Sequence, residues 1–136
     1  MSAPMTAART ESHEKAVVRR LVDEVMNARR LDALDGLCTP SMAHRWRRWV
    51  APFLASFPDM RMEIVRLVAE GDTVVGRFTC SATHRGEWRG HAATGRRFEK
   101  VDEVYFFRFE AGRIADAWGL EDTLDRMRQL GLAEPS

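Results

Sequence analysis

The sequence predicts an α+β domain in which helices come first, a strongly curved antiparallel sheet of four strands follows, and a short helix ends the chain. Three observations support this prediction. Apolar residues recur at helical spacing in residues 12–57, and they alternate with polar residues at strand spacing from residue 60 onward. Short polar breaks that contain glycine separate the strand segments, as expected for hairpins.

Two or three helices are expected ahead of the sheet, the third being a short piece with Leu31, Leu34 and Leu37. Ser12 can cap a helix over residues 12–30, whose apolar face is formed by Val18, Leu21, Val22 and Val25. A helix over residues 45–57 has its apolar residues on one stripe, formed by Trp46, Trp49, Val50, Phe53, Leu54 and Phe57. Because Pro52 removes an internal hydrogen bond, we expect a kink there or a helix that begins near Ala51.

Four antiparallel strands are expected near residues 60–69, 73–84, 96–109 and 113–120. The clearest turn signals are Glu70-Gly71-Asp72 and Glu110-Ala111-Gly112-Arg113. A terminal helix is expected near residues 122–130. There Leu124, Met127 and Leu130 recur at three-residue spacing, and Gly131 fits the position just after a helix.

The composition, with 136 residues of which 45% are hydrophobic and 30% charged, is ordinary for one soluble globular domain. We expect this domain over residues 12–132, between a disordered tail (1–11) and a short C-terminal tail (133–136). A net charge of only +1 argues against nucleic acid as the main partner. The N-terminus lacks an apolar signal-peptide core, and no run of about 18 apolar residues occurs, so neither secretion nor membrane insertion is expected.

The two cysteines, Cys38 and Cys80, are widely spaced and match neither a zinc motif nor a disulfide framework. We therefore expect two buried free thiols and no metal site. Free thiols are typical of a reducing compartment, which predicts a cytoplasmic protein.

The acids near the last two strands are candidates for chemistry. Period-two alternation places five residues on one face of the return strand: Ile114, Asp116, Trp118, Leu120 and Asp122. An acid beside an indole is poorly solvated, so its pKa rises and it can transfer protons near neutral pH. Asp122 also stands where a helix N-cap is expected, and both roles remain open. Asp102 and Glu103 are adjacent, so at most one of them faces a cavity.

Two histidines and a tryptophan are further candidates. His44 precedes the apolar stripe of residues 45–57, either as a base that lines a pocket or as a half-exposed residue at a helix end. The register of the second strand puts His84 on the inner side, as a pocket residue or as a satisfied side chain. Trp88, in a segment punctuated by glycines, is a candidate lid or subunit contact.

Several segments together resemble the SnoaL-like polyketide cyclases and ester cyclases, which belong to the ketosteroid-isomerase-like and nuclear-transport-factor-like cone folds. These segments are FPDMRMEI, EGDTVVGRF, THRGEWRG with TGRR, FFRFEAGRI and WGLEDTLDRMRQLG. The resemblance spans Ser12 to Leu132 and implies a conical α+β barrel around an apolar cavity, commonly in a dimer. It places the family's acid at Asp122 and its histidines at His44 and His84. Relatives usually carry a longer loop between His44 and Phe57.

The resemblance implies a cyclase that closes a ring in a polyketide, or in a similar small apolar carbonyl compound, by aldol-type acid–base chemistry without a cofactor. Asp122 would take the proton from carbon, and His84 or His44 would return one to the new alkoxide. The expected substrate-binding residues are Trp118, Trp88, Tyr105, Phe107, Glu103 and Trp46.

The sequence is also compatible with other functions. A SnoaL-like hydroxylase has no distinguishing residue in the sequence, and a non-catalytic small-molecule-binding or dimerisation module of the same fold is a third possibility. An epoxide hydrolase is disfavoured because neither Arg77 nor Arg108 has an acid two residues away within the expected strands, 73–84 and 96–109. A homodimer is expected, since few helices are available to cover the outer face of the sheet.

Overall fold

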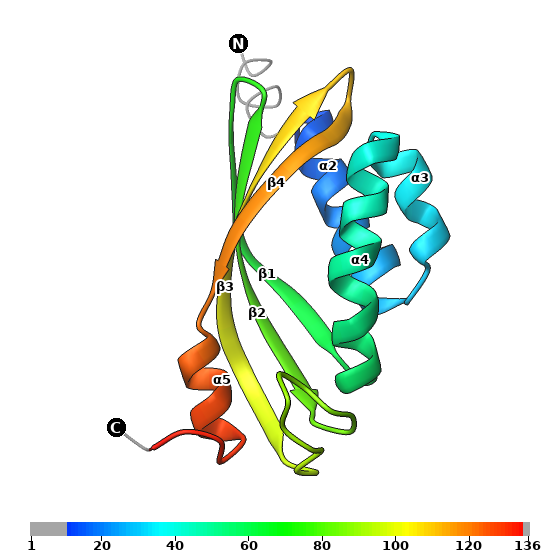
Figure 1. Ribbon diagram of the computed structural model, residues 1–136. Helices are drawn as coiled ribbons and strands as arrows, with labels where there is room; N and C mark the ends of the chain where they lie inside the picture. The colour runs from blue at the N-terminus through cyan, green and yellow to red at the C-terminus, as the bar shows by residue number, and fades with distance from the viewer. Residues whose placement is uncertain (1–10, 135–136) are drawn as a thin grey trace.

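The computed structural model describes residues 11–134, which form a four-stranded sheet with the N-terminal helices on one side of it (Figure 1). The expected tails at 1–11 and 133–136 lie outside this range except for Glu11, Ala133 and Glu134. The helical elements are α2 (His13–Arg20), the π-helical η1 (Leu21–Asn27), the 3-10 turn η2 (Leu31–Ala33), α3 (Leu34–Leu37), α4 (Pro40–Ser56) and α5 (Thr123–Gln129). The strands are β1 (Arg61–Glu70), β2 (Thr73–Thr83), β3 (Arg97–Glu110) and β4 (Arg113–Glu121).

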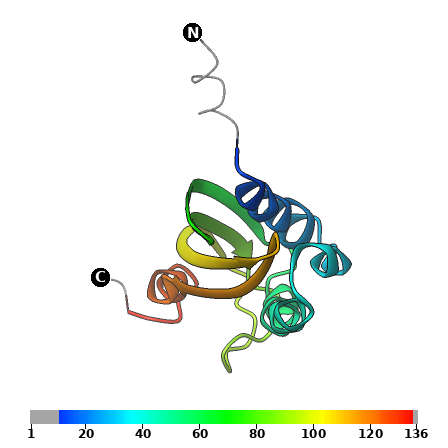
Figure 2. The ribbon, with the colours of Figure 1, turned by 90° about the horizontal axis from the view of Figure 1, so that it is seen from above.

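The sheet is antiparallel with the strand order β1-β2-β3-β4, so the predicted α+β class and the four strands are confirmed. Viewed from above, the sheet is strongly curved, and the N-terminal helices cover its concave side (Figure 2). The helix α5 packs at the end of the sheet opposite the β1–β2 and β3–β4 turns (Figure 1). The core between helices and sheet is apolar, with Val18, Leu34, Met42, Phe78, Phe98 and Phe107 almost fully buried.

Helix α4 differs from the prediction, because it begins at Pro40 and not near residue 45 or Ala51. Thr39 caps it by accepting a hydrogen bond from the Met42 amide, and proline at the first helical position costs no internal hydrogen bond. Pro52 lies inside the helix and is exposed to solvent. Its ring therefore disturbs the helix on the side where water can satisfy the backbone group that loses its partner.

The strands carry three irregularities that bend the sheet, between Ile64 and Arg66, between Cys80 and Ala82, and between Arg108 and Phe109. The third irregularity skips Ala115 on β4, since Arg108 pairs with Asp116 while Phe109 pairs with Ile114. A bulge of this kind increases the local twist and shifts the alternation of side chains by one residue.

Because of the bulge at Ala115, the even-numbered residues of β4 do not share one face, so the expectation for Ile114, Trp118 and Leu120 is wrong. Ile114 is 1% exposed and Ala117 is 6% exposed, so both face the core although their positions differ by an odd number. Trp118 and Leu120 are 58% and 64% exposed and lie on the outer face. The residues of β4 beyond the bulge that face inward are therefore the odd-numbered ones, which include Gly119 and Glu121.

Side-chain amides attach two helical segments to strand backbone. Asn27, at the end of η1, donates to the Met62 carbonyl at 2.9 Å and accepts from the Met62 amide at 2.8 Å. Gln129 in α5 makes the same pair of bonds with Glu99, at 3.1 Å and 2.8 Å. Each amide satisfies a backbone donor and an acceptor that have no strand partner at that position.

We predict that Asn27→Ala lowers the free energy of unfolding by about 1–3 kcal/mol, because two backbone groups of Met62 lose their partner. Urea denaturation measures this change. The matched control is Asp23→Ala, an exposed residue one turn earlier in the same helix. Equal stability of the two variants would show that the amide pair does not hold η1 to β1.

Candidate active site

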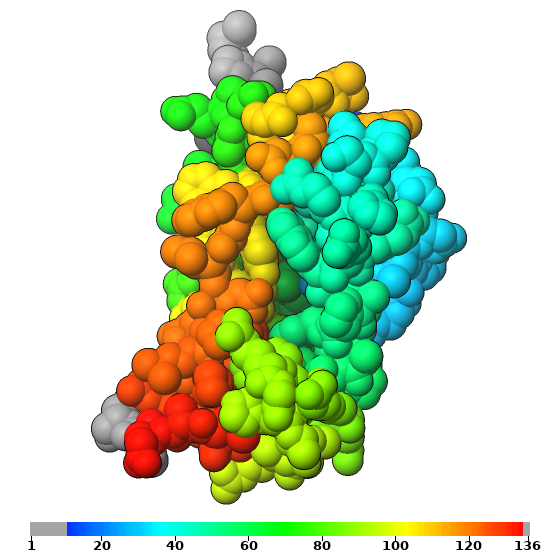
Figure 3. Space-filling model, in the orientation of Figure 1, coloured from blue at the N-terminus to red at the C-terminus, as the bar shows by residue number. Residues whose placement is uncertain are grey.

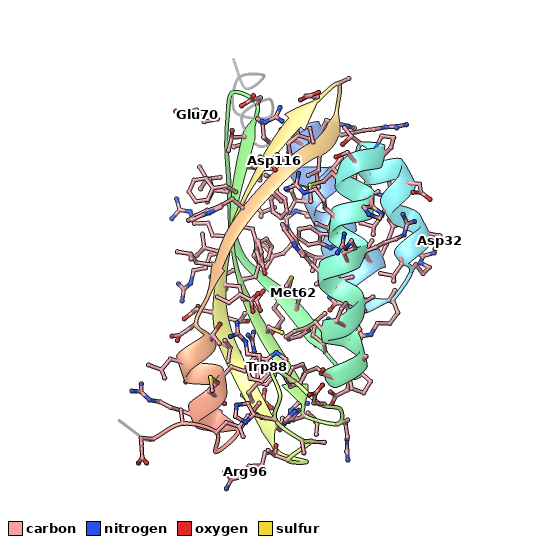
Figure 4. The ribbon with its side chains drawn as sticks, in the orientation of Figure 1. Asp32, Met62, Glu70, Trp88, Arg96 and Asp116 are labelled. Carbon is pink, nitrogen blue, oxygen red and sulfur yellow. The ribbon has the colours of Figure 1, made fainter. Side chains whose placement is uncertain are left out.

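A cavity of about 80 Å³ lies between α4 and the inner face of the sheet. Its wall is mostly apolar and consists of Met26, Trp46, Trp49, Val50, Phe53, Met60, Met62 and Cys80, to which Glu103, Tyr105 and Glu121 add polar groups. Met62, labelled in Figure 4, lies between the sheet and α4. A mostly apolar lining with a few convergent polar groups is typical of a small-molecule site, although a volume of about 80 Å³ holds only part of a polyketide-sized molecule.

The cavity adjoins an open groove between α4 and β4, which is visible as a hollow between the teal and orange atoms of Figure 3. Three residues, Trp49, Tyr105 and Glu121, line both the cavity and the groove. At the groove, Arg45 of α4 and Asp116 of β4 form an ion pair of 2.7 Å. A ligand that enters from the groove therefore meets the tyrosine hydroxyl and a carboxylate before it reaches the apolar interior.

A network of charged groups, in which Arg126 and Glu103 are buried and Glu121 is partly exposed, forms the polar side of the cavity. Arg126 of α5 donates to Glu103 Oε2 at 2.8 Å through one terminal nitrogen and to Glu121 Oε1 at 2.7 Å through the other. Tyr105 donates from its hydroxyl to Glu121 Oε2 at 3.1 Å. Arg126 and Glu103 are only 1% and 3% exposed. Both carboxylates are thus held by one guanidinium group, and one of them also binds the tyrosine.

The strand register explains why two acids meet here. Glu103 and Glu121 are direct cross-strand partners on β3 and β4. Like charges opposite each other destabilise a sheet, and a cation between them removes the repulsion. Of the adjacent acids on β3, Glu103 faces the cavity, while Asp102 faces outward and pairs with Arg77 at 2.8 Å. The expectation that at most one of the two faces inward is confirmed.

Aromatic rings surround the guanidinium of Arg126. Its central carbon lies 4.8 Å from the ring centre of Phe98, 5.2 Å from that of Phe53 and 6.0 Å from that of Trp88. Contacts of a cation with ring faces offset part of the loss of hydration. Burial acts to lower the pKa of Arg126, but Glu121 and Glu103 outweigh it and the pKa is raised. Arg126 therefore remains charged.

The same environment shifts the pKa values of the acids. Burial raises the pKa of Glu103 from 4.5 to about 7, with a further contribution from Glu121 and an opposing one from Arg126. Burial and the two nearby carboxylates also raise the pKa of Tyr105, so its hydroxyl stays protonated at neutral pH. Glu103 can consequently both take and give a proton near neutrality.

The three residues proposed from the sequence as catalytic lie outside this cavity. Asp122 is exposed and caps α5 by accepting from the Asp125 amide at 3.0 Å, so the expectation that it faces a cavity beside Trp118 is wrong. His44 is exposed on α4. His84 is fully buried, and its Nδ1 accepts from the Thr94 amide at 3.2 Å.

The expected substrate-binding residues divide into two groups. Trp46, Glu103 and Tyr105 line the cavity. Phe107 is buried behind Trp46, with ring centres 6.0 Å apart. Trp118 borders only the open groove, and Trp88 packs edge-on against Phe57.

Two polar residues of the site were missed in the sequence. Glu121 faces inward only because of the bulge at Ala115, for which the sequence gives no signal. Leu124, Met127 and Leu130 predicted an apolar face of the last helix that does not include Arg126, yet Leu124 is 50% exposed and Arg126 is buried. The spacing of four residues between Arg126 and Leu130, both 1% exposed, is the signal that could have identified the buried face.

Both cysteines are buried free thiols, as expected, and burial raises the pKa of Cys38 to about 11. Within residues 11–134, no group of three or more His, Cys, Asp and Glu side chains is arranged to hold a metal ion. In the same part of the chain, no helix has both the length and the apolar character needed to cross a membrane.

We predict that the free energy of unfolding falls as the pH rises from about 4.5 to about 7. A carboxyl group with a higher pKa in the folded state binds a proton preferentially in that state, so deprotonation favours the unfolded chain. Urea denaturation at a series of pH values measures the slope, which Glu103→Gln should flatten. The same slope in the variant and the wild type would contradict the assignment of the shift to Glu103.

Comparison with known proteins identifies the family. Residues 16–130 match the family model described as SnoaL-like polyketide cyclase. No curated protein matches the chain. A similar structure is that of AclR, a candidate hydroxylase from Streptomyces galilaeus, with a TM-score of 0.79, 25% identity, and coverage of 92% of this chain and 100% of that chain.

IdmH, a candidate polyketide cyclase from Streptomyces antibioticus, has a TM-score of 0.77 and 26% identity, and the match covers 88% of this chain and 99% of that one. A SnoaL-like protein from a Jannaschia species has a TM-score of 0.82 at 21% identity, covers 93% and 99% of the two chains, and supports the fold alone. The match covers residues 16–130, and the curved sheet and the apolar cavity beneath α4 are consistent with it. The chain belongs to the SnoaL-like polyketide cyclase family.

Proposed function

We propose that this protein is a cyclase that closes a ring in a small polyketide-like carbonyl compound, with Glu103 as the group that transfers the proton. The observation that carries the proposal is the position of Glu103, buried in the wall of an apolar cavity with a pKa raised to about 7. A carbon between two carbonyls is acidic enough for a carboxylate to deprotonate. The carboxylate is most effective as a base when its pKa is near the working pH.

The proposed reaction begins when Glu103 takes a proton from the carbon between two carbonyls, which leaves an enolate. The enolate carbon then attacks a distant carbonyl of the same molecule, and a carbon–carbon bond forms while that carbonyl becomes an alkoxide. The cavity contributes by holding the two reacting carbons close together, since its tryptophan and phenylalanine side chains restrict the chain to folded shapes. A proton returned to the alkoxide completes an aldol addition with no net change in protons.

Arg126 supports this role by fixing the carboxylate. One of its terminal nitrogens donates to Glu103 Oε2 at 2.8 Å and holds the carboxylate in the cavity wall. Because Arg126 also binds Glu121, it keeps the cavity from holding two uncompensated negative charges. The contact with Arg126 acts to lower the pKa of Glu103, but the effect of burial is larger and the pKa is raised.

A second candidate is hydroxylation, since AclR, 25% identical in sequence, is named as a candidate hydroxylase. The same buried acid would then form an enolate that reacts with dioxygen, and an external reductant would supply two electrons so that one oxygen atom stays on the carbon as a hydroxyl group and the other leaves as water. Product analysis separates the two activities, because cyclisation followed by dehydration loses water whereas hydroxylation adds oxygen. A non-catalytic binding role would leave the substrate unchanged.

We predict that Glu103→Gln lowers the rate of ring closure by about 10²–10⁴, because an amide cannot take the proton. A suitable probe is a nonanetrione with ketones at the second, fourth and eighth carbons, in which the third carbon can close a six-membered ring. Nuclear magnetic resonance follows the cyclic product.

The matched control is Asp122→Asn, which replaces the acid that caps α5. Asparagine caps helices about as well as aspartate, so this variant should retain both its stability and its activity. Full activity of Glu103→Gln would contradict the proposed role of Glu103. A loss confined to Asp122→Asn would instead favour Asp122 as the acid.

We also propose a homodimer that forms through the outer face of the sheet. Apolar side chains cross this face from one edge strand to the other, and those at least 43% exposed include Val68, Phe106, Trp118 and Leu120. They form neighbouring cross-strand positions, since Phe106 pairs with Trp118 and Val68 pairs with Val75, the partner of Phe106. A two-fold partner that presents the same apolar face would remove this surface from water.

Analytical ultracentrifugation should therefore show a dimer at micromolar concentration, and Leu120→Lys should yield a folded monomer because it places a charge in the contact. Ala51→Lys, which adds the same charge to the exposed side of α4, should leave the dimer intact. A monomeric wild-type protein would contradict the proposal.

A further inference from the structure

Tyr105 lies on β3 between two glycines in register, with Gly76 of β2 on one side and Gly119 of β4 on the other. A Cβ atom at Gly119 would overlap the ring of Tyr105, and one at Gly76 would overlap the ring of Phe78. Both aromatic rings therefore lie close to strand backbone, in space that a side chain at either glycine would fill. The inner surface of the sheet is shaped so that the tyrosine ring lies over β4.

This position determines where the hydroxyl group lies. From Gly119 the ring reaches the next inward-facing residue of β4, and its hydroxyl donates to Glu121 Oε2 at 3.1 Å. The indole of Trp46 packs edge-on against the ring, with centres 5.9 Å apart, and limits its movement toward α4. Tyr105 lines both the cavity and the groove, so a bound molecule that extends from one to the other passes it.

We propose that Tyr105 is a second catalytic residue, which returns the proton to the alkoxide formed on ring closure, and that Gly119 is the residue that positions its ring. This inference rests on the proposed cyclase function. The sequence suggested His44 or His84 as the residue that returns a proton to the alkoxide. Neither histidine lines the cavity, so Tyr105 takes this role. Cys80 also lines the cavity, but it is 1% exposed and belongs to the core.

The proton balance of this step is complete. The phenol O–H bond breaks as the alkoxide gains the proton, and a tertiary alcohol and a tyrosinate result. Burial and the carboxylates raise the pKa of Tyr105, so its proton stays on the phenol until the alkoxide, a stronger base than an ordinary phenolate, forms beside it. Glu103 then passes the proton that it took from carbon to the tyrosinate, either by way of Glu121 or by way of water. The enzyme returns to its starting state.

The decisive experiment compares Tyr105→Phe, which keeps the ring, with Glu103→Gln on the nonanetrione probe. We expect Tyr105→Phe to lower kcat by about a hundredfold with little change in KM, because the proton donor acts after binding. Gly119→Ala should lower kcat to a similar extent by displacing the ring. Gly36→Ala is the matched control, since a Cβ atom there meets nothing within 4 Å.

A second measurement does not depend on substrate. Tyr105 is the one tyrosine of the sequence, so the ultraviolet absorbance of phenolate reports its ionisation alone. In the wild type, phenolate should appear above the ordinary tyrosine pKa of about 10. Glu121→Gln should shift its appearance to lower pH by removing the carboxylate that accepts from the hydroxyl, whereas Gly36→Ala should not.

The outcomes separate the two proposals. Wild-type kcat in Tyr105→Phe, with Glu103→Gln inactive, would overturn the role of Tyr105 and leave the cyclase function standing. Wild-type rates in both variants, or no acceleration by the wild type, would overturn both. A wild-type tyrosine that ionises like free tyrosine would also overturn the role of Tyr105, because its hydroxyl would not be held by Glu121.

Discussion

The contact of Arg126 with Glu103 and Glu121 is the interaction on which the arrangement of this protein depends. The sheet register places the two acids opposite each other, and the guanidinium group from α5 makes that register tolerable. Breaking a buried ion pair by removing one partner typically costs about 3–5 kcal/mol, because the remaining charge stays buried without compensation. The terminal helix is therefore part of the site, and Asp122 contributes by capping the helix that carries Arg126.

A network of two carboxylates and one cation leaves one negative charge without a partner when both acids are ionised. In an apolar cavity this excess charge is costly, and binding a proton relieves it. The pKa of Glu103 is raised because protonation removes this unfavourable charge. The same burial that reduces stability at neutral pH thus gives the carboxyl group the proton affinity that acid–base chemistry requires. Stability and reactivity are coupled through one side chain.

The sequence was sufficient for the strands, since side-chain alternation and the glycine-containing turns are local signals that survive folding. It was not sufficient for the site. The bulge at Ala115 exchanges the faces of β4, so Asp122 and Trp118 point away from the interior while Glu121 points into it. The burial of Arg126 is favourable only because the two acids are already there, and its four-residue spacing from Leu130 does not by itself report those acids. Helix α4 was misplaced because Pro52 suggested a break, whereas its exposed position allows the helix to continue.

The most direct measurement is the ionisation of Glu103 itself, observed through the carboxyl carbon in nuclear magnetic resonance of protein labelled with carbon-13 glutamate. Comparison of the wild type with Glu103→Gln assigns the signal. A titration centred near 7, well above the ordinary value of 4.5, is expected for a carboxyl group buried beside Glu121 in an apolar cavity. A Glu103 signal that titrates near 4.5 would show that Arg126 keeps it permanently ionised, and Glu103 would then be a structural partner of the helix and not a proton-transfer group.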